Sequence, residues 1–290
     1  MALVDTRFAT RSVEHAAAEP AAPTPASKHL AGAARLKGLL VPLVLLALWQ
    51  GLSARGVFEP HLVPAPVDVF EEIRRLVATG ELWTHLAATG QRVGLGFLFG
   101  SLAALVLGTA TGASRGLREL LDPTLQALKA VPSLAWVPLF ILWFGIFETS
   151  KVTLIAVGAF FPVYLNLASA IQGTDRKLVE VARVNRLGPW RTIRHVLVPA
   201  TLPAFVVGLR GGLALGWMFV IAAELMGASE GLGFLMVDGQ MTGRPAVIVA
   251  SLLLFAVAGK VSDAALALAA RPYLAWQDSL ASIERGGTHA

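Results

Sequence analysis

The sequence contains no cysteine, and only 15% of its 290 residues are charged. The missing cysteines exclude a disulfide framework, a thiolate metal site and a cysteine nucleophile. A soluble domain carries roughly 25% charged residues, whereas 55% of this chain is hydrophobic. We therefore expect an all-α protein that crosses a lipid bilayer several times. The net charge of +5 does not indicate nucleic-acid binding, because basic loops on one side of a membrane produce the same excess.

Motifs for chemistry are also missing. The sequence has no GxxxxGK[ST] phosphate-binding loop, so it offers no nucleotide site of that type. Its six histidines are scattered, and no pair has the spacing of metal ligands. No cluster of serine, histidine and acid falls within one apolar run. We expect neither an enzyme nor a cofactor in this chain.

Long apolar runs predict about six transmembrane helices. They cover residues 38–54, about 82 or 92 to 112, 120–147, 152–171, 200–226 and 245–270. Residues 148–151 would form a short outer turn, and residues 227–244 a Gly-rich outer connection that could dip partly into the membrane. Pro132 and Pro138 interrupt the third run, which indicates either a broken helix along a transport path or a packing kink. Gly96 and Gly100 are four residues apart in the second run, a spacing that permits close helix approach.

The remaining segments complete the expected domain organisation. Residues 1–35 are rich in Ala and Pro and predict a disordered tail. A signal peptide is the alternative for the apolar run that follows, although this run starts far from Met1. Residues 36–79 would hold the first span and an outer amphipathic helix. Residues 80–270 would form the transmembrane domain, with a polar tail over residues 271–290.

A basic segment between the fourth and fifth runs is the most informative part of the chain. The loop, residues 172–199, carries six of the chain's basic side chains: Arg176, Lys177, Arg183, Arg186, Arg191 and Arg194. This charge predicts a cytoplasmic loop, and the same side would hold both termini. Thr174 or Asp175 can cap a first short helix, and Gly188 and Pro189 would end it. The loop is either an ordinary positive-inside connection or a docking element for a soluble partner.

The spacing within this loop resembles a known signature. Binding-protein-dependent ABC importer permeases carry Glu-Ala-Ala, three residues, Gly, nine residues, Ile, one residue and Leu-Pro. This chain has Glu180, Val181 and Ala182, followed in register by Val196, Val198 and Pro199. It departs from the signature by placing Arg186 at the glycine position, with Gly188 two residues later. The departure leaves the turn geometry open.

Further runs extend the resemblance over residues 36–275. LDPTLQALKAVPSLAWVPLFILWFGIFETSK (121–151), FPVYLN (161–166) and LLFAVAGKVSDAAL (253–266) look like the nitrate, sulfonate and taurine branch, closest to aliphatic sulfonate permeases. The resemblance implies a type I ABC importer permease fold in a bacterial inner membrane. It also implies a second permease copy as a homodimer, ATP-binding subunits and a periplasmic solute-binding protein.

The resemblance and the cost of placing charges inside a membrane together give the candidate site residues. In the loop, the resemblance makes Glu180 the main contact to the ATP-binding subunit, with Ala182 and Arg183 beside it; a local ion pair with Arg183 or Arg176 is the alternative. Charges inside a membrane are costly and are functional candidates. Arg210 could meet an anion along the path, or could make only a structural hydrogen bond to a neighbouring helix. Glu224, near the outer end, would fix the outer loop or gate.

Three further expectations can be tested. Lys260 and Asp263 are three residues apart on the last span and should pair with each other. A membrane-embedded enzyme would need paired polar residues at one depth, and none is found. A secondary transporter should show inverted internal repeats, and no convincing repeat is present.

Overall fold

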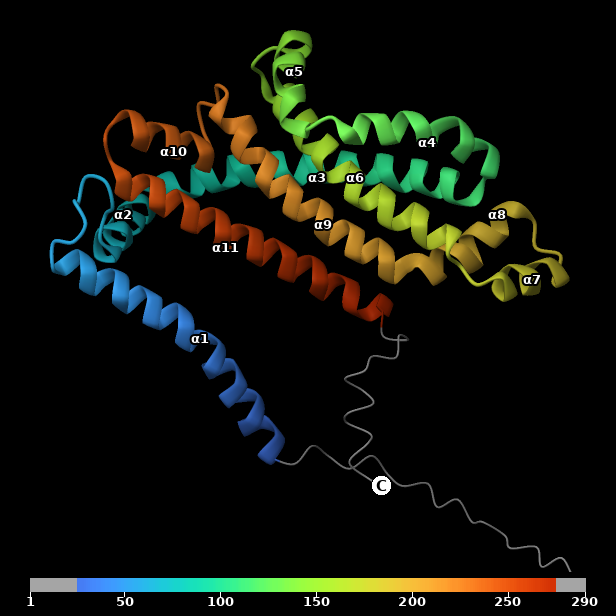
Figure 1. Ribbon diagram of the computed structural model, residues 1–290, viewed down its shortest axis with the longest axis horizontal. Helices are drawn as coiled ribbons and strands as arrows, with labels where there is room; N and C mark the ends of the chain where they lie inside the picture. The colour runs from blue at the N-terminus through green and yellow to red at the C-terminus, as the bar shows by residue number, and fades with distance from the viewer. Residues whose placement is uncertain (1–24, 275–290) are drawn as a thin grey trace, which may run out of the picture. The chain divides into compact units, whose positions relative to one another are not determined.

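The protein is described by a computed structural model covering residues 25–274, with side chains from residue 40 onward except those of Ser133, Arg176, Val179, Arg183 and Pro189 (Figure 1). The expectations for residues 1–24 and 275–290 fall outside this range. The described residues divide into two compact units at Gly51, and each unit is considered by itself. The expected all-α class is confirmed, since residues 25–274 form helices without any strand.

Eleven α-helices are found in this range. They are α1 (Pro25–Ala54), α2 (Pro66–Thr79), α3 (Glu81–Ala113), α4 (Arg115–Ala130), α5 (Val137–Phe144), α6 (Glu148–Gln172), α7 (Arg176–Val184), α8 (Pro189–Thr192), α9 (Val198–Leu225), α10 (Leu232–Met241) and α11 (Pro245–Ala270). A π-helical turn, Ile193–Leu197, joins α8 to α9 without a break. Short 3-10 turns precede α5 and follow α11.

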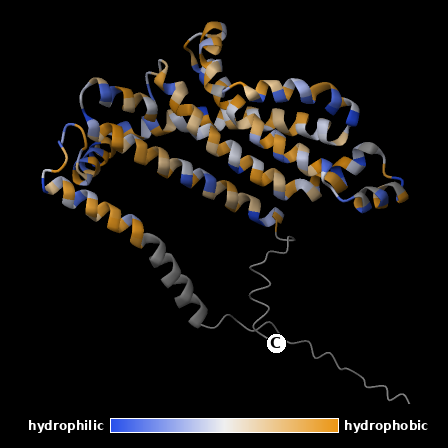
Figure 2. Cartoon of the chain, in the orientation of Figure 1, coloured by the Kyte–Doolittle hydropathy of each residue, from blue (hydrophilic) through white to orange (hydrophobic). Residues whose placement is uncertain are grey.

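Within residues 25–274, four helices are long and apolar enough to cross a membrane. They are Glu81–Ala113, Glu148–Gln172, Trp190–Leu225 and Pro245–Leu274. The segments Arg115–Ala130 and Leu134–Phe144 together form a fifth candidate, bent by 86° where Pro132 interrupts the sequence. The first expected span is shorter than these, an apolar helix over Leu40–Ala54. Figure 2 shows apolar residues along these helices, and many of their large apolar side chains are exposed, among them Leu98, Phe99 and Val257, as expected for faces that meet lipid.

One expected boundary is wrong. Residues 148–151 were expected as an outer turn, but they form the first turn of α6. Glu148 suits this position because a carboxylate is favourable at the positive end of a helix dipole. Residues 227–244, expected as a Gly-rich connection, contain the separate helix α10, and a partial dip of this segment into the membrane stays a prediction. The expected amphipathic outer helix is present as α2, with Val69 and Leu76 buried and Phe70 exposed.

Small residues bring α3, α6 and α9 close together, and these helices lie side by side in Figure 1. A Cβ atom at Gly96 would lie 2.5 Å from Ile155, and one at Gly100 would overlap the carbonyl oxygen of Ala156. On α9, a Cβ at Gly212 would lie 2.8 Å from the carbonyl oxygen of Ala159. The small-residue face predicted for the second apolar run is therefore the α3–α6 contact.

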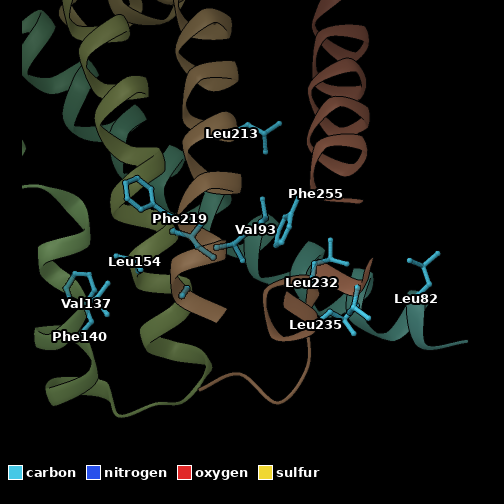
Figure 3. Close-up of a cluster of buried hydrophobic side chains, with 14 of the residues drawn as sticks. Leu82, Val93, Val137, Phe140, Leu154, Leu213, Phe219, Leu232, Leu235 and Phe255 are labelled. Carbon is cyan, nitrogen blue, oxygen red and sulfur yellow. The ribbon is translucent and has the colours of Figure 1, made fainter. Parts of the chain in front are cut away.

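The main apolar core lies where α3, α6, α9 and α11 meet α10 (Figure 3). Phe219 of α9 packs over Gly158 of α6, where any side chain would collide with its ring. Leu232 and Leu235 bring α10 into the same core and are almost fully buried. The core thus fixes α10 at the end of the bundle opposite to α7 and α8 (Figure 1).

Candidate functional site

The loop between α6 and α9 forms two short helices, as the sequence indicates. Asp175 caps α7, because its Oδ1 accepts a hydrogen bond from the Lys177 backbone N–H at 2.9 Å. The predicted end of the first helix at Gly188 and Pro189 is wrong: α7 ends at Val184. Gly188 instead begins α8, since its carbonyl accepts the Thr192 backbone N–H at 2.9 Å.

Arg186 explains how the signature turn survives without its glycine. It has a φ of +50° and is the one non-glycine residue with positive φ among residues 25–274. The Leu187 backbone N–H donates to the Ala182 carbonyl at 3.0 Å, the pattern of a helix that ends in a left-handed residue. Arg186 therefore adopts the conformation that glycine takes freely, at a cost of about 1–2 kcal/mol. The turn geometry left open by the sequence is thus a left-handed helix end at Arg186.

The surface of this loop is apolar as well as basic. Ala182 is fully buried beneath the turn, whereas Leu178, Val181 and Val184 are exposed at the spacing of one helix face. Trp190 at the start of α8 is 72% exposed. Glu180 is exposed beside this face. Its alternative ion pairs with Arg176 and Arg183 lie outside the described side chains.

A buried charge network occupies the opposite end of the bundle. Arg92 of α3 donates from Nε and Nη2 to the Glu148 carboxylate at 2.6 and 2.8 Å. Its Nη1 donates to Glu224 Oε1 at 2.7 Å. Lys151 donates to Glu148 at 3.0 Å. The Arg92, Lys151 and Glu224 side chains are 7%, 6% and 0% exposed, while that of Glu148 is 59% exposed.

Glu224 accepts two further kinds of hydrogen bond in this network. The Thr89 hydroxyl donates to its carboxylate at 2.8 Å, and the Gly233 backbone N–H donates at 2.7 Å. Two positive and two negative side chains balance, so each buried charge has an opposite charge within hydrogen-bond distance. The expectation that Glu224 fixes the outer loop agrees with its contact to the first turn of α10.

Sequence reasoning did not assign a role to Arg92. An arginine in an apolar run needs an acidic partner, which makes Arg92 a candidate in principle. The partner could not be chosen from the sequence, because Glu224 lies 132 residues away. The sequence signal that could have suggested this pair is that Arg92 and Glu224 are charges of opposite sign, each within an apolar run.

Arg210 and Asp263 form a second charge pair nearer to the other end of the bundle. Arg210 Nε and Nη2 donate to the two Asp263 carboxylate oxygens at 2.7 and 2.8 Å. The expected pair between Lys260 and Asp263 is wrong: among the described residues, the ion pair within 4 Å of Asp263 is with Arg210. A helix spacing of three permits a pair, but a planar guanidinium on the facing helix binds both carboxylate oxygens at once.

The Arg210–Asp263 pair is half open in the single chain. The Arg210 side chain is 48% exposed and that of Asp263 is 28% exposed. The same two helices are also joined by Trp217, whose Nε1 donates to Ser262 Oγ at 2.8 Å. The alternative of a structural bond from Arg210 to a neighbouring helix therefore agrees with the geometry.

Other sites give little indication of chemistry. Among the described residues, no group of three His, Asp or Glu side chains could hold a metal ion. An open hollow of about 460 Å³ lies beside α6 and α9, with Asn166 and Ser169 as its polar lining. Within α6, Asn166 Nδ2 donates to the Pro162 carbonyl at 2.8 Å, so this amide group is hydrogen-bonded to its own helix.

These features define a class of protein: a multi-spanning membrane subunit with an exposed two-helix loop at one end and a hydrogen-bonded charge network at the other. Residues 96–271 match the family described as "Binding-protein-dependent transport system inner membrane component". The chain belongs to this family. It is therefore a component of a transporter and not an enzyme, and the family implies an ATP-binding subunit and a substrate-binding protein as partners.

Several relatives cover most of the chain. It is 42% identical over 244 residues to SsuC of Bacillus subtilis, named as an aliphatic sulfonates transport permease, covering 84% of this chain and 88% of that protein. SsuC of Escherichia coli is 38% identical over 253 residues, covering 87% and 95%. TauC of Escherichia coli, a taurine transport system permease, is 30% identical over 238 residues, covering 80% and 86%.

A solved structure supports the fold. A chain of the MetNI methionine ABC transporter, in an inward-facing conformation, superposes with a TM-score of 0.52 at 18% identity. The match covers 64% of this chain and 97% of that one. At this identity the match bears on the fold alone, and it confirms the type I importer permease fold expected from the sequence.

Proposed function

We propose that this chain is the permease subunit of an ATP-driven ABC importer that carries aliphatic sulfonates across a bacterial inner membrane. The observation that carries this proposal is the 42% identity to SsuC of Bacillus subtilis over 84% of the chain. Taurine is the second candidate substrate, favoured by the 30% identity to TauC. Nitrate or another small solute of the same branch is a further alternative.

The loop of residues 172–199 would couple this chain to the ATP-binding subunit. Its exposed apolar face on α7 and exposed Trp190 have no partner of their own in the described chain, and basic residues surround them. Such a surface fits a groove on a soluble subunit, where apolar side chains give affinity and charges give orientation. The proposed coupling residues are Glu180, Arg183, Arg186, Gly188 and Pro199, with the buried Ala182 packed beneath the turn that presents them.

Two copies of the chain would form the path, with both termini on the cytoplasmic side. Most of the 24 lysines and arginines support this orientation, because they fall on the side of the coupling loop. Arg210 would line the path as part of its pair with Asp263, and Glu224 would act at the outer gate. A partly exposed ion pair on membrane helices should contact either another protein surface or water, because exposing these charges to lipid would be costly.

Uptake in a strain lacking this chain tests the substrate. The strain would receive an alkanesulfonate, taurine or sulfate as its sole sulfur source, or nitrate as its sole nitrogen source. Each growth test would be run with and without the chain restored from a plasmid. We expect growth and labelled uptake to fail on alkanesulfonates alone. Failure on taurine or nitrate alone would move the substrate within the branch, and growth on every source would refute the oxyanion assignment.

A charge reversal in the loop tests the energy source. Glu180→Lys should abolish ATP-driven uptake and weaken binding of the ATP-binding subunit, whereas Glu119→Lys, an exposed acid on α4, serves as the matched control. Normal uptake by Glu180→Lys would reject the coupling assignment. Uptake that continues without any ATP-binding subunit would favour a secondary transporter, and conversion of the solute would favour a membrane-embedded enzyme.

A further inference from the structure

The helix α10 is joined to the bundle by glycines with unusual backbone angles. Gly227 and Gly231 precede it with φ of +94° and +130°, and Gly243 follows it with φ of +63°. Side chains rarely tolerate these angles, and glycine adopts them freely. The two connections of α10 are thus built from the residue that permits the widest range of backbone angles.

The first turn of α10 is attached to α3 and α9 by side chains and not by its own helix. The backbone N–H groups of Gly231 and Leu232 donate to His85 Nδ1 at 3.0 Å and to Thr89 Oγ1 at 2.8 Å. The Gly233 N–H donates to Glu224 at 2.7 Å. These are the amides that a helix start leaves without intrahelical partners, so the network holds α10 at the point where it begins.

Arg92 connects this attachment to the outer surface. Its Nη1 donates to both Glu224 and the Glu230 carbonyl, at 2.7 and 2.6 Å, on the α10 side. Its other donors bind Glu148, whose side chain is 59% exposed. Among the described residues, Arg92 is therefore the one that contacts the buried Glu224, the Glu230 carbonyl just before α10 and the exposed Glu148 carboxylate together.

We propose that Arg92 is a positioning residue that latches α10 as a movable outer gate, and that its exposed partner Glu148 sets how readily the latch opens. This inference rests on the proposed import function, which requires an outer gate. Weakening the Arg92–Glu148 bond frees Arg92 from one of its two acids. The hydrogen bonds to Glu230 and Glu224 then hold α10 less firmly, while the apolar core around α6 stays packed.

The absence of cysteine makes a direct test available. Leu235→Cys places a thiol on the buried face of α10, where Leu235 is 4% exposed. Val163→Cys places one in the α6 core, where Val163 is 0% exposed. Each would be introduced into the full transporter complex in nanodiscs, and the labelling rate with a membrane-impermeant maleimide would be measured. The α10 thiol reports movement of α10, and the α6 thiol reports general unfolding.

Glu148→Gln and Arg92→Lys are the test variants, because each keeps the approximate size and removes the bidentate charge pair. We expect both to raise labelling of the α10 thiol by about five- to thirtyfold, with no change at the α6 thiol. Arg115→Gln is the matched control, since it breaks the exposed Arg115–Glu119 pair on α4. It should leave both labelling rates unchanged.

Two results would overturn the inference. Unchanged labelling of the α10 thiol in both variants would mean that the bond does not restrain α10. Equal increases at the α10 and α6 thiols would mean that Arg92 supports the fold as a whole. Uptake by the parent complex is measured alongside: an inactive parent refutes the proposed function, whereas an active parent with unchanged labelling refutes only the latch.

Discussion

Arg92 and Arg210 both lie on apolar helices that can cross a membrane, but they differ in burial and in the number of their hydrogen-bond partners. Arg92 is almost fully buried and binds two acids and a backbone carbonyl. Arg210 is half exposed and binds Asp263 alone. In the orientation proposed above, Arg92 belongs to the outer network, which completes its contacts within a single chain, whereas Arg210 belongs to the inner pair, which is open on one side. The comparison indicates that the Arg92 network stabilises this chain's own fold, while the Arg210–Asp263 pair stays accessible in the single chain.

Removing Glu224 should give the largest loss of stability. Glu224→Ala leaves Arg92, Thr89 and the Gly233 N–H without their shared acceptor, and breaking a buried pair costs about 3–5 kcal/mol. Thermal unfolding of the purified complex would measure the loss. Glu119→Ala, on an exposed helix pair, is the control and should change stability by less than about 0.5 kcal/mol. Similar losses for the two variants would contradict the special position of the outer network.

Gly231→Ala should give the next largest effect by disturbing the same acceptor. The new Cβ would lie 2.5 Å from the Glu224 carboxylate atoms, at a φ of +130°. We expect a loss of about 2–3 kcal/mol, part of it from backbone strain. Gly243→Ala separates the two causes, because Gly243 also has positive φ but has no atom within 4 Å of the added Cβ. If both variants lose the same stability, strain alone explains the effect and the collision with Glu224 does not.

The sequence predicted the elements of this comparison better than the contacts between them. Apolar runs located α3, α6, α9 and α11 because hydrocarbon demands a long uninterrupted run of apolar side chains. The two short helices of the coupling loop were also predicted, since Asp175 is a cap residue. The end of α7 was misplaced because Gly188 looked like the terminator, whereas Arg186 adopts the left-handed angle.

Contacts between distant helices could not be derived in the same way. The Arg92–Glu224 pair joins residues 132 positions apart, and the Arg210–Asp263 pair joins residues 53 positions apart. Local spacing favoured Lys260 as the partner of Asp263, because a helix places residues three apart on one face. The choice of Arg210 depends on how α9 packs against α11. That packing is set by the shapes of Trp217, Gly259 and Phe255, which periodicity does not reveal.

Exchanging the charges of the inner pair should have a smaller effect on stability and a clear effect on transport. Arg210→Asp alone and Asp263→Arg alone each place two like charges together on membrane helices, so uptake should fall at least tenfold. The double exchange restores opposite charges at the same positions and should recover much of the uptake. The unfolding temperatures of the two single variants should fall by less than that of Glu224→Ala. Equal uptake by the singles and the double exchange would show that the pair itself is irrelevant to transport.

Lys260→Met should have the smallest effect on stability and decides between two interpretations of the inner face. Lys260 is exposed on α11, and none of the described carboxylates lies within 4 Å of its ammonium group. If the facing guanidinium alone holds Asp263, removing Lys260 leaves that bidentate pair intact, and the melting temperature should stay within about 2 °C of the parent protein. Asp263→Asn in the same assay should lower it further, because Arg210 then loses its charged partner. A larger decrease in melting temperature for Lys260→Met than for Asp263→Asn would support the Lys260–Asp263 pair that the spacing predicted. It would also mean that the inner face, like the outer network, depends on more than one contact.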